Sequence, residues 1–306
     1  MGIMEQRGFS ILIPTWNNLP YLKLCIQSIR KHSCFQHQII VHVNDGSDGT
    51  LEWIKREEGI DFTHSDTNIG VCLAMNSMRP LVRMPYIYFI NDDMYLLPGW
   101  DQVLMEEVTK LPDNKFYLSS TMIQPHDKND VGLCINYGDS VEGFQEEKLL
   151  REFMNVPYGD WQGSTRPPTL VHRDIWDLVG GYSIELTPGM YSDPDFVAKL
   201  LMVGVHYLKG LGNSRVYHFE TKTTRRIKKN NGNLQFLLKW GMSNSTMRKY
   251  ITRQGEAWEN RQQPINHQAI KRSESFAHFK AIWYLLRKGF GVANKLSSYV
   301  DRKFLS

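Results

Sequence analysis

The sequence predicts an α/β fold with a largely parallel central sheet covered by helices on both faces. Short apolar runs alternate with amphipathic stretches between residues 9 and 90, and turn-forming residues separate them. This alternation is typical of βαβ units, in which a helix returns the chain to the same edge of a parallel sheet. The clearest of the turns is Asp-Gly-Ser-Asp-Gly at residues 45–49.

The elements of this first part follow from the spacing of apolar residues. Strands are predicted at residues 9–15, 38–43, 60–64 and 86–90. Helices are predicted around residues 21–29, 50–58 and 70–78, where apolar residues recur at helical spacing. Thr50 follows the Asp-Gly turn and is placed to cap the second of these helices.

The next part continues with less regular spacing. Helices are predicted at residues 98–111, after residue 172 as far as Val179, and at residues 196–202. Strands are predicted at residues 116–122, 169–172, 206–208 and 215–219. Residues 124–160 are polar and irregular, and a connection of this length in a compact domain is often functional.

The character of the chain changes after Glu220. Five cations fall within residues 222–229, and helices are predicted at residues 234–250 and 276–287. We therefore expect a catalytic domain over residues 1–220 and a basic loop with a helical extension over residues 221–306. The basic loop either closes over a ligand as a lid or is simply a solvated loop.

The composition excludes several classes of protein. Hydrophobic residues make up 42% and charged residues 22% of the 306, as in ordinary globular domains, which excludes a disordered chain, a collagen and a disulfide-rich miniprotein. The net charge of +4 is too small to indicate a nucleic-acid partner. The four cysteines include no C-x-x-C pair, so no zinc ribbon is indicated. No apolar run approaches the roughly 20 residues of a spanning helix, and no signal-peptide pattern is visible. We expect a soluble, cytoplasmic protein.

Polar residues follow the predicted strands where each one ends. They are Thr15-Trp16-Asn17-Asn18, Asn44-Asp45-Gly46-Ser47, Asp66-Thr67-Asn68 and Asn91-Asp92-Asp93. Ligands of open α/β sheets bind beyond the carboxyl ends of the strands. Each segment alone is ordinary turn chemistry, but four of them on one edge favour a binding site.

Asn91-Asp92-Asp93 is the candidate metal site. Oxygen ligands at a strand end suit Mg²⁺ or Mn²⁺, which can also bridge a diphosphate. Strand alternation predicts that Asn91 and Asp93 share one face and that Asp92 points away. The alternative is that these residues cap the helix that follows near Pro98.

Three further residues have two possible roles. Asp193 and Asp195 precede a helix, where an Asp is most often an N-cap, but one of the two is then left as a possible general base. His218, at the end of a predicted strand, is either structural or a neutral ligand to the same metal.

Several well-known motifs are missing. There is no G-x-G-x-x-G after the first strand, no P-loop, no H-E-x-x-H and no G-x-S-x-G. Dinucleotide oxidoreductases, P-loop nucleotidases, zincins and α/β-hydrolases are therefore not supported.

In order along the chain, these segments resemble the family 2 glycosyltransferases of the GT-A fold, from about residue 9 to residue 219. The matching segments are residues 11–18, 43–50 and 68–70 with Ala74 and Asn76, residues 89–93, Val179-Gly180-Gly181-Tyr182, Ser192-Asp193-Pro194-Asp195 and Val216-Tyr217-His218. The resemblance implies a Rossmann-like, mostly parallel sheet flanked by helices. It also implies transfer of a hexosyl or deoxyhexosyl group from a UDP-, dTDP- or GDP-linked donor, with inversion.

The resemblance also implies roles for individual residues. The nucleotide-binding residues it implies are Pro14, Thr15, Asn17, Asp45, Asn68, Asn91 and Asp92. Asp93 and His218 become ligands of Mn²⁺ or Mg²⁺, and Asp193 becomes the general base. The sequence departs from the family pattern at Asn91, where the first Asp of D-x-D is expected, and at Ser192, where a Glu is expected.

The acceptor and the carboxyl-terminal region are less defined. The acceptor would be a saccharide, glycolipid or glycoprotein, bound by the stretch of residues 124–166. Tyr158 and Trp161 of this stretch could stack on a sugar ring, and the alternative for Trp161 is a place in the core. The basic, aromatic carboxyl-terminal region could rest on an anionic membrane surface, form a helical subdomain or mediate dimer contact. The alternatives to a transferase are a sugar-phosphate nucleotidyltransferase, an inactive relative and a polymer-binding module.

Overall fold

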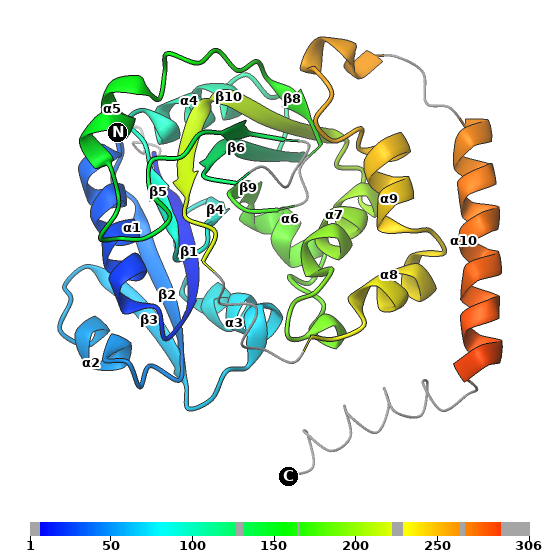
Figure 1. The fold of residues 1–306 in the computed structure, drawn as a ribbon, viewed down its shortest axis with the longest axis horizontal. Coiled ribbons are helices and arrows are strands. Elements are labelled where there is room, and N and C mark those ends of the chain that lie inside the picture. Colours follow the sequence, from blue (N-terminus) through cyan, green and yellow to red (C-terminus); the bar gives the residue numbers. More distant parts are fainter. Residues whose placement is uncertain (1–6, 127–130, 164–165, 222–228, 263–266, 289–306) are drawn as a thin grey trace, which may run out of the picture.

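A computed structural model describes residues 7–126, 131–163, 166–221, 229–262 and 267–288. Its centre is one twisted, mixed sheet in the order β3-β2-β1-β4-β9-β6-β10-β5 (Figure 1). The strands are β1 (Phe9–Trp16), β2 (Gln38–Asn44), β3 (Ile60–Ser65), β4 (Tyr86–Phe89), β5 (Met94–Leu96), β6 (Phe116–Gln124), β9 (Thr169–His172) and β10 (Tyr207–His218). The short strands β7 (Leu133–Cys134) and β8 (Trp161–Gln162) pair with β6 and β10.

Strand direction decides where the site lies. β1, β2, β3 and β4 are parallel to one another, and β10 is parallel to β6. β9 is antiparallel to both β4 and β6, so β6 runs in the same direction as β4. The carboxyl ends of β1, β2, β4, β6 and β10 therefore meet at one edge of the sheet, which is where ligands bind in such folds.

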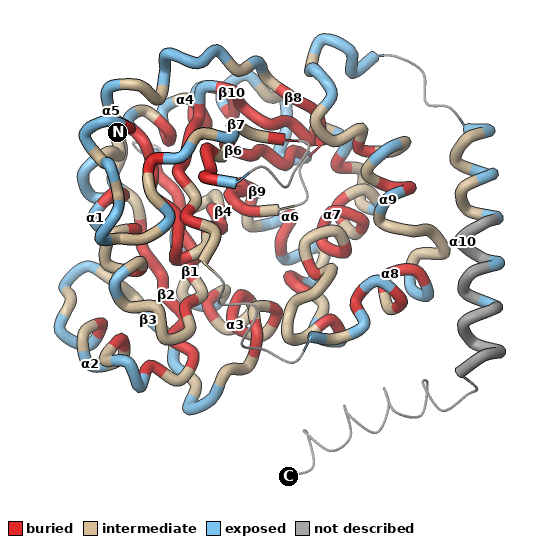
Figure 2. Tube along the Cα trace, viewed as in Figure 1, coloured by how far each residue is buried: buried red, intermediate tan, exposed pale blue. Residues whose placement is uncertain are grey.

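Helices cover both faces of the sheet, as the sequence predicts. On one face, α1 (Leu19–His32) and α4 (Trp100–Val108) pack against Ile11 and Ile13 of β1. On the other face, α3 (Gly70–Met78), α6 (Arg173–Leu178) and α7 (Ser192–Met202) pack in the cluster that contains Leu12. Alternate residues of β1 thus enter opposite cores, which is the burial pattern of a strand covered on both sides. Figure 2 shows burial concentrated in these central strands.

Several predicted elements differ from the structure. The two strands predicted at residues 206–208 and 215–219 are one continuous strand, β10. The helix predicted at residues 50–58 is the shorter α2 (Thr50–Ile54), and the irregular stretch contains a helix, α5 (Glu146–Glu152). β5 was not predicted at all, because three residues between polar turns give too little pattern.

The helix predicted at residues 234–250 is broken. α8 (Gly232–Trp240) ends at Gly241, which has φ 66° and so adopts the left-handed conformation that closes a helix. A short α9 (Asn244–Thr246) and a π-helical turn (Met247–Ile251) follow. Phe236 and Met247 are buried in the same cluster as α7, so this part of the chain packs directly on the α/β body.

The last described helix, α10 (His267–Lys288), lies beside α8 and α9 (Figure 1). The Thr246 and Ser273 hydroxyls are 2.7 Å apart at this contact. Among the described residues, no helix combines the length and the apolarity needed to span a membrane. The basic loop, residues 222–228, and the residues after 288 lie outside the described residues.

Candidate active site

A cavity of about 490 Å³ opens at the carboxyl edge of the sheet. Eight of the residues singled out from the sequence line it: Pro14, Thr15, Asn68, Asn91, Asp92, Asp93, Asp193 and His218. They come from strand ends, from the start of α3 and from the start of α7, and are up to 204 positions apart in the sequence. Asn17 and Asp45 do not line the cavity; they hydrogen-bond to each other next to it.

Asn17 and Asp45 join the loops after β1 and β2. The Asn17 Nδ2 donates to Asp45 Oδ2 at 2.9 Å, and its Oδ1 accepts from the Gly46 amide at 2.9 Å. Both residues have positive φ, 46° and 62°, a conformation that Asn and Asp tolerate better than most residues. Hydrogen bonds from Ser47 and Asn17 hold the pKa of Asp45 below its usual range, so it is an anion at neutral pH.

Asn44, which was not predicted as a site residue, connects the same strand ends to α3. Its Oδ1 accepts from the Ile69 amide at 2.9 Å, and its Nδ2 donates to the Thr15 carbonyl at 3.3 Å. It is buried and lines the cavity. An Asn at the end of a strand resembles ordinary turn chemistry in a sequence, so only the structure distinguishes it.

One wall of the cavity is a close contact between α3 and the loop before α7. The Val71 amide donates to the Pro188 carbonyl at 2.9 Å. A Cβ added at Gly70, which has φ 79°, would lie 2.6 Å from the Pro188 Cα. Glycine is therefore required at position 70 both by the backbone conformation and by the space available. Asn68 supports this turn by accepting from the Gly70 amide at 2.9 Å.

The prediction that Asp92 points away from the site is wrong. β4 ends at Phe89, so strand alternation does not extend to residues 91–93. Asp92 Oδ2 accepts from the Thr15 hydroxyl at 2.6 Å, and all three residues of Asn91-Asp92-Asp93 line the cavity. The alternative role as a helix cap is also excluded, because α4 begins after Gly99 with no side-chain cap.

Asp93 is the most constrained acid of the site. Its Oδ2 accepts from both the amide and the hydroxyl of Thr221 at 2.8 Å, and its Oδ1 lies 3.4 Å from His218 Nε2. Burial alone would raise the pKa of Asp93, but His218 and Thr221 outweigh it and lower the pKa. Burial alone would likewise lower the pKa of His218, and the neighbouring Asp93 raises it instead. The two side chains form a buried ion pair at the end of β10.

The residues fit a divalent ion as a partial site. Two ligands cis to each other on such an ion lie about 3 Å apart, close to the 3.4 Å between Asp93 and His218. His218 Nδ1 is buried without a hydrogen-bond partner among the described residues. In that same part of the chain, no group of three or more His, Cys, Asp or Glu side chains is arranged to hold a metal. An ion here would therefore need further oxygens, as Mg²⁺ takes from substrate phosphates.

Asp193 lies in the first turn of α7 and faces the cavity. The α7 N-cap is Tyr191, with no side-chain cap, so neither Asp193 nor Asp195 caps this helix. Burial raises the pKa of Asp193 to about 6, although the Tyr182 hydroxyl donates to its Oδ1 at 3.0 Å and, like the charge of Arg166, opposes the shift. A carboxylate that is ionised just below neutral pH is suited to accept a proton.

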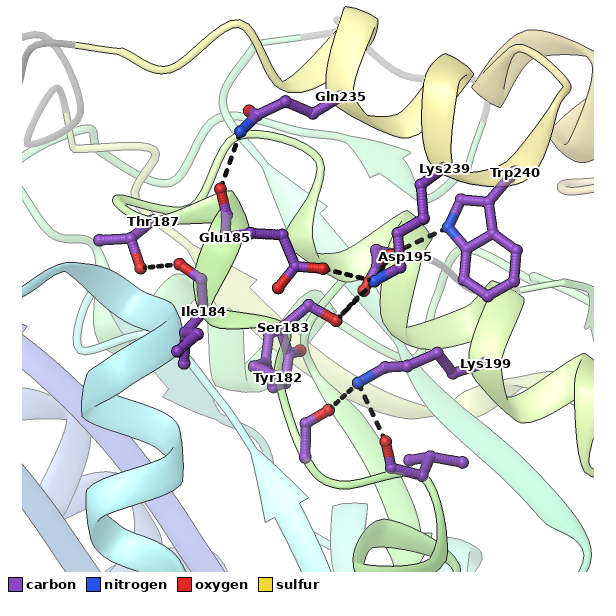
Figure 3. Close-up of polar contacts among 12 residues, drawn as sticks. Tyr182, Ser183, Ile184, Glu185, Thr187, Asp195, Lys199, Gln235, Lys239 and Trp240 are labelled. Carbon is purple, nitrogen blue, oxygen red and sulfur yellow. Dashed lines mark hydrogen bonds and ion pairs between the residues drawn. The ribbon is translucent and has the colours of Figure 1, made fainter. Parts of the chain in front are cut away.

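Asp195 is occupied by other contacts (Figure 3). It is fully buried and accepts from Ser183 Oγ at 2.5 Å and from Trp240 Nε1 at 2.9 Å. Lys239 Nζ lies 2.8 Å from its Oδ1 and also 2.8 Å from Glu185. Asp195 therefore holds α8 against α7, which leaves Asp193 as the carboxylate that faces the cavity.

The predicted acceptor stretch contributes less than expected. Of residues 124–166, the structure describes Gln124 and Arg166 as lining the cavity. Trp161 belongs to the core: its Nε1 donates to Thr121 Oγ1 at 2.9 Å, and its ring fills the space beside Gly210. The Tyr158 hydroxyl accepts from the Gly132 amide at 2.9 Å, and Tyr158 does not line the cavity.

A family model described as glycosyl transferase family 2 matches residues 10–162, which is half of the chain. The matched region includes every predicted nucleotide contact and Asp93. It ends before Asp193 and His218.

Two curated relatives come from Bacillus subtilis (strain 168). The chain is 25% identical over 170 residues to a putative glycosyltransferase EpsH, across 49% of each chain. It is 32% identical over 103 residues to an uncharacterized glycosyltransferase EpsJ, across 32% of this chain and 29% of the relative. The chain thus spans about half or less of the length of the curated relatives it matches.

Solved structures share the fold at low identity. S. aureus TarS 1–349 aligns with a TM-score of 0.52 and 14% identity, across 69% of this chain and 60% of that one. GalNAc-T7 with UDP, GalNAc and Mn²⁺ aligns with a TM-score of 0.55 and 12% identity, across 89% and 59%. These matches extend the similarity of fold beyond the region covered by the family model.

Proposed function

This chain belongs to glycosyl transferase family 2, and we propose that it transfers a sugar from a nucleoside diphosphate donor to an acceptor hydroxyl. Its fold is the GT-A fold. The observation that carries the proposal is the single cavity at the carboxyl edge, which combines Thr15 and Asn68, the Asp93–His218 pair and the ionisable Asp193. A nucleotide, a diphosphate and a proton acceptor are the requirements of this reaction.

We assign the nucleotide to the ends of β1 and β2. Pro14, Thr15 and Asn68 line the cavity there, and Asp45 is held as an anion beside it. A carboxylate at this position can accept the imide N–H of uracil or thymine. We propose a UDP-linked donor as the first to test, since TarS structures similar in fold hold UDP or UDP-GlcNAc.

We assign the diphosphate to the segment that follows β4, where Asp93 meets His218 at the end of β10. Asp93 and His218 would hold Mn²⁺ or Mg²⁺, which, when bound, would neutralise charge on the leaving diphosphate. Thr221 fixes the Asp93 carboxylate through two hydrogen bonds and so keeps its other oxygen directed to His218. Asn91 and Asp92 complete this part of the wall.

Asp193 acts as the general base in this proposal. The acceptor oxygen attacks C1 of the sugar, Asp193 takes the hydroxyl proton, and the bond from C1 to the diphosphate oxygen breaks with its electron pair. Attack opposite the leaving group inverts the configuration at C1. Tyr182 orients the carboxylate by donating to its Oδ1. The acceptor belongs to the saccharides or their lipid and protein conjugates, bound beside Asp193.

Thermal unfolding with a panel of nucleotides tests the proposal. We expect UDP, or else GDP or dTDP, to raise the melting temperature more with Mn²⁺ than without it. Saturation at 100 times the dissociation constant adds about 2.7 kcal/mol of stability, which such a measurement detects readily. In Asp93→Ala the metal-dependent part of the shift should disappear.

The control is Asp113→Ala, since Asp113 is an exposed acid in the loop between α4 and β6 and does not line the cavity. It should respond to the nucleotide as wild type does. If no nucleotide stabilises the wild type with or without metal, the proposed function is wrong. A nucleotide shift that Asp93→Ala retains in full would refute the metal assignment alone.

A further inference from the structure

Gln124 is a buried polar residue of the cavity that none of the assignments above uses. It is the last residue of β6 and is 3% exposed. Its carboxamide oxygen is buried and has no hydrogen-bond partner among the described residues. Buried polar groups of native proteins are almost always hydrogen-bonded, so an unpaired one in a ligand cavity points to a group supplied by the ligand.

The strand fixes the direction of this side chain. Residues two apart on a strand share a face, and both Met122 and Gln124 line the cavity. Ile123, between them, enters a separate apolar cluster on the other face. The Gln124 carbonyl accepts from the Ile135 amide at 3.0 Å, and Gln124 pairs with Cys134, so β7 holds the backbone at this position.

The position of β6 in the sheet indicates which part of a donor Gln124 faces. The nucleotide residues lie at the ends of β1 and β2, and Asp93 lies beside His218 at the end of β10. β6 lies between β9 and β10, and Ile123 pairs with Tyr217, so Gln124 lies one strand spacing, about 5 Å, from His218. A nucleotide sugar has the order base, ribose, diphosphate, sugar. The sugar is bonded to the diphosphate that we assign to Asp93 and His218, so a side chain beside this pair is within reach of the sugar.

The chemistry of the carboxamide matches this neighbour. A Gln side chain offers two N–H donors and one acceptor oxygen, and a sugar hydroxyl is both a donor and an acceptor. The apolar side chains of Met122 and Pro167 also line the cavity, as expected of a wall that holds the ring of a sugar. Neither a phosphate, which only accepts, nor a cation, which the neighbouring acids bind, would use both functions of the amide.

We propose that Gln124 binds a hydroxyl or acylamino group of the transferred sugar and so contributes to the choice of donor. This inference rests on the proposed function, because it needs a nucleotide sugar in the cavity. It assigns Gln124 to the donor, whereas the sequence places residue 124 at the start of an acceptor-binding stretch. The two assignments predict different kinetic effects.

The test compares affinities for a nucleoside diphosphate and for its sugar conjugate. Calorimetric titration compares wild type with Gln124→Leu, and the nucleotide panel decides which ligands are used. They are UDP with UDP-glucose and UDP-N-acetylglucosamine, GDP with GDP-mannose, or dTDP with dTDP-glucose. We expect both proteins to bind the free diphosphate equally within twofold. Gln124→Leu should bind the preferred sugar conjugate about tenfold more weakly, because a hydrogen bond in a buried site is lost.

Two further variants separate binding from folding. Ser119→Ala is the matched control, since the Ser119 hydroxyl is also buried and unpaired, lies on the same strand and does not line the cavity. It should leave both affinities unchanged. Ligand-free Gln124→Leu should melt at or above the wild-type temperature, because it removes an unpaired buried oxygen. Gln124→Met, which keeps the length of the side chain and loses both functions of the amide without adding a charge, should weaken only the conjugate.

Each other outcome overturns the inference. If Gln124→Leu retains the affinity for the conjugate, or loses diphosphate affinity to the same extent, Gln124 does not bind the sugar, while the proposed function stands. If donor affinity is kept and the acceptor KM rises, Gln124 belongs to the acceptor site. If the wild type binds no diphosphate at all, the proposed function fails and this inference with it.

Discussion

Two carboxylates in the first turn of α7 have different surroundings. Asp195 faces the junction with α8, and Asp193 faces the cavity. At the junction, three side-chain donors contact Asp195: Ser183, Trp240 and Lys239, all within 2.9 Å. At the cavity, Asp193 accepts from the Tyr182 hydroxyl at 3.0 Å and lines the open space. The two residues are separated only by Pro194. Surroundings, and not local sequence, therefore make one acid structural and leave the other open to the cavity.

The largest expected effect is on turnover at the cavity side of this turn. Asp193→Asn keeps the shape of the side chain and cannot accept a proton, so kcat should fall by about 100-fold to 10,000-fold, the range typical of general base catalysis. Calorimetric titration should show the affinity for the nucleoside diphosphate unchanged within twofold. A variant that transfers sugar at near the wild-type rate would remove Asp193 as the base.

The next effect is on stability at the junction side. Asp195→Asn leaves Lys239 without its buried partner and weakens the contact between α7 and α8, so the free energy of unfolding should fall by about 3 kcal/mol. Denaturant titration measures this change. Asp177→Asn is the control, because Asp177 pairs with Arg79 at a half-exposed site and should cost less than about 1 kcal/mol. Equal losses in the two variants would contradict a structural role specific to Asp195.

The same measurement on Asp193→Asn should give a change of opposite sign. The folded-state pKa of Asp193, about 6, lies above its ordinary value of 3.8, so ionisation of this group opposes folding. The wild type therefore loses stability as the pH rises through about 6, and the Asn variant does not. At pH 7.5 the variant should be about 2 kcal/mol more stable, and at pH 4 the difference should be close to zero. A variant less stable than wild type at pH 7.5 would contradict this.

The smallest expected effect tests how Tyr182 supports the base. Tyr182→Phe removes the donor to Asp193, so the pKa of Asp193 should rise further and the acid limb of the pH profile of kcat/KM should move up from about 6. The shift should be less than about one pH unit. Arg166 also lowers the pKa of Asp193, and Cys72 and Tyr117 are close enough to interact with its charge. None of these three residues is altered in the variant.

The control for this shift is Tyr88→Phe. The Tyr88 hydroxyl is buried against Ser120 at 2.7 Å and belongs to the other core cluster. Both variants lose a buried hydrogen bond, and only Tyr182→Phe should change the pH profile. An unchanged profile in Tyr182→Phe would show that this hydrogen bond does not influence the base.

Much of the fold could be predicted because the parallel strands leave a strong local pattern. The helix at residues 70–78 and the strand at residues 169–172 have the predicted bounds. The middle of β10 was not predicted, since Gly210 and Gly212 interrupt the apolar pattern between the two predicted strands. Glycine is needed at both positions because there is no space for a Cβ. A Cβ at Gly210 would lie 1.8 Å from the Trp161 ring, and one at Gly212 would lie 1.9 Å from the Tyr158 carbonyl. Such contacts between distant segments leave no local signal.

The site shows the same limit. Strand ends predicted the residues that gather at the cavity, and Asp93 and His218 do form a pair although 125 positions separate them. The structure separates the roles of Asp193 and Asp195 through Lys239 and Trp240, whose contribution depends on the packing of α8. Gln124 and Arg166 lie at the two ends of a stretch whose sequence gives no indication of which residues face the cavity.

The separation of β4 from β6 by β9 also bears on how such a protein can diverge. The strand ends to which we assign the nucleotide are held together by contacts such as Asn17–Asp45 and Asn44–Ile69, neither of which involves β6. A substitution at position 124 therefore leaves that framework intact. A duplicated gene could change its donor sugar by single steps at the end of β6 while it keeps the ancestral nucleotide, so that new specificity need not pass through an inactive intermediate.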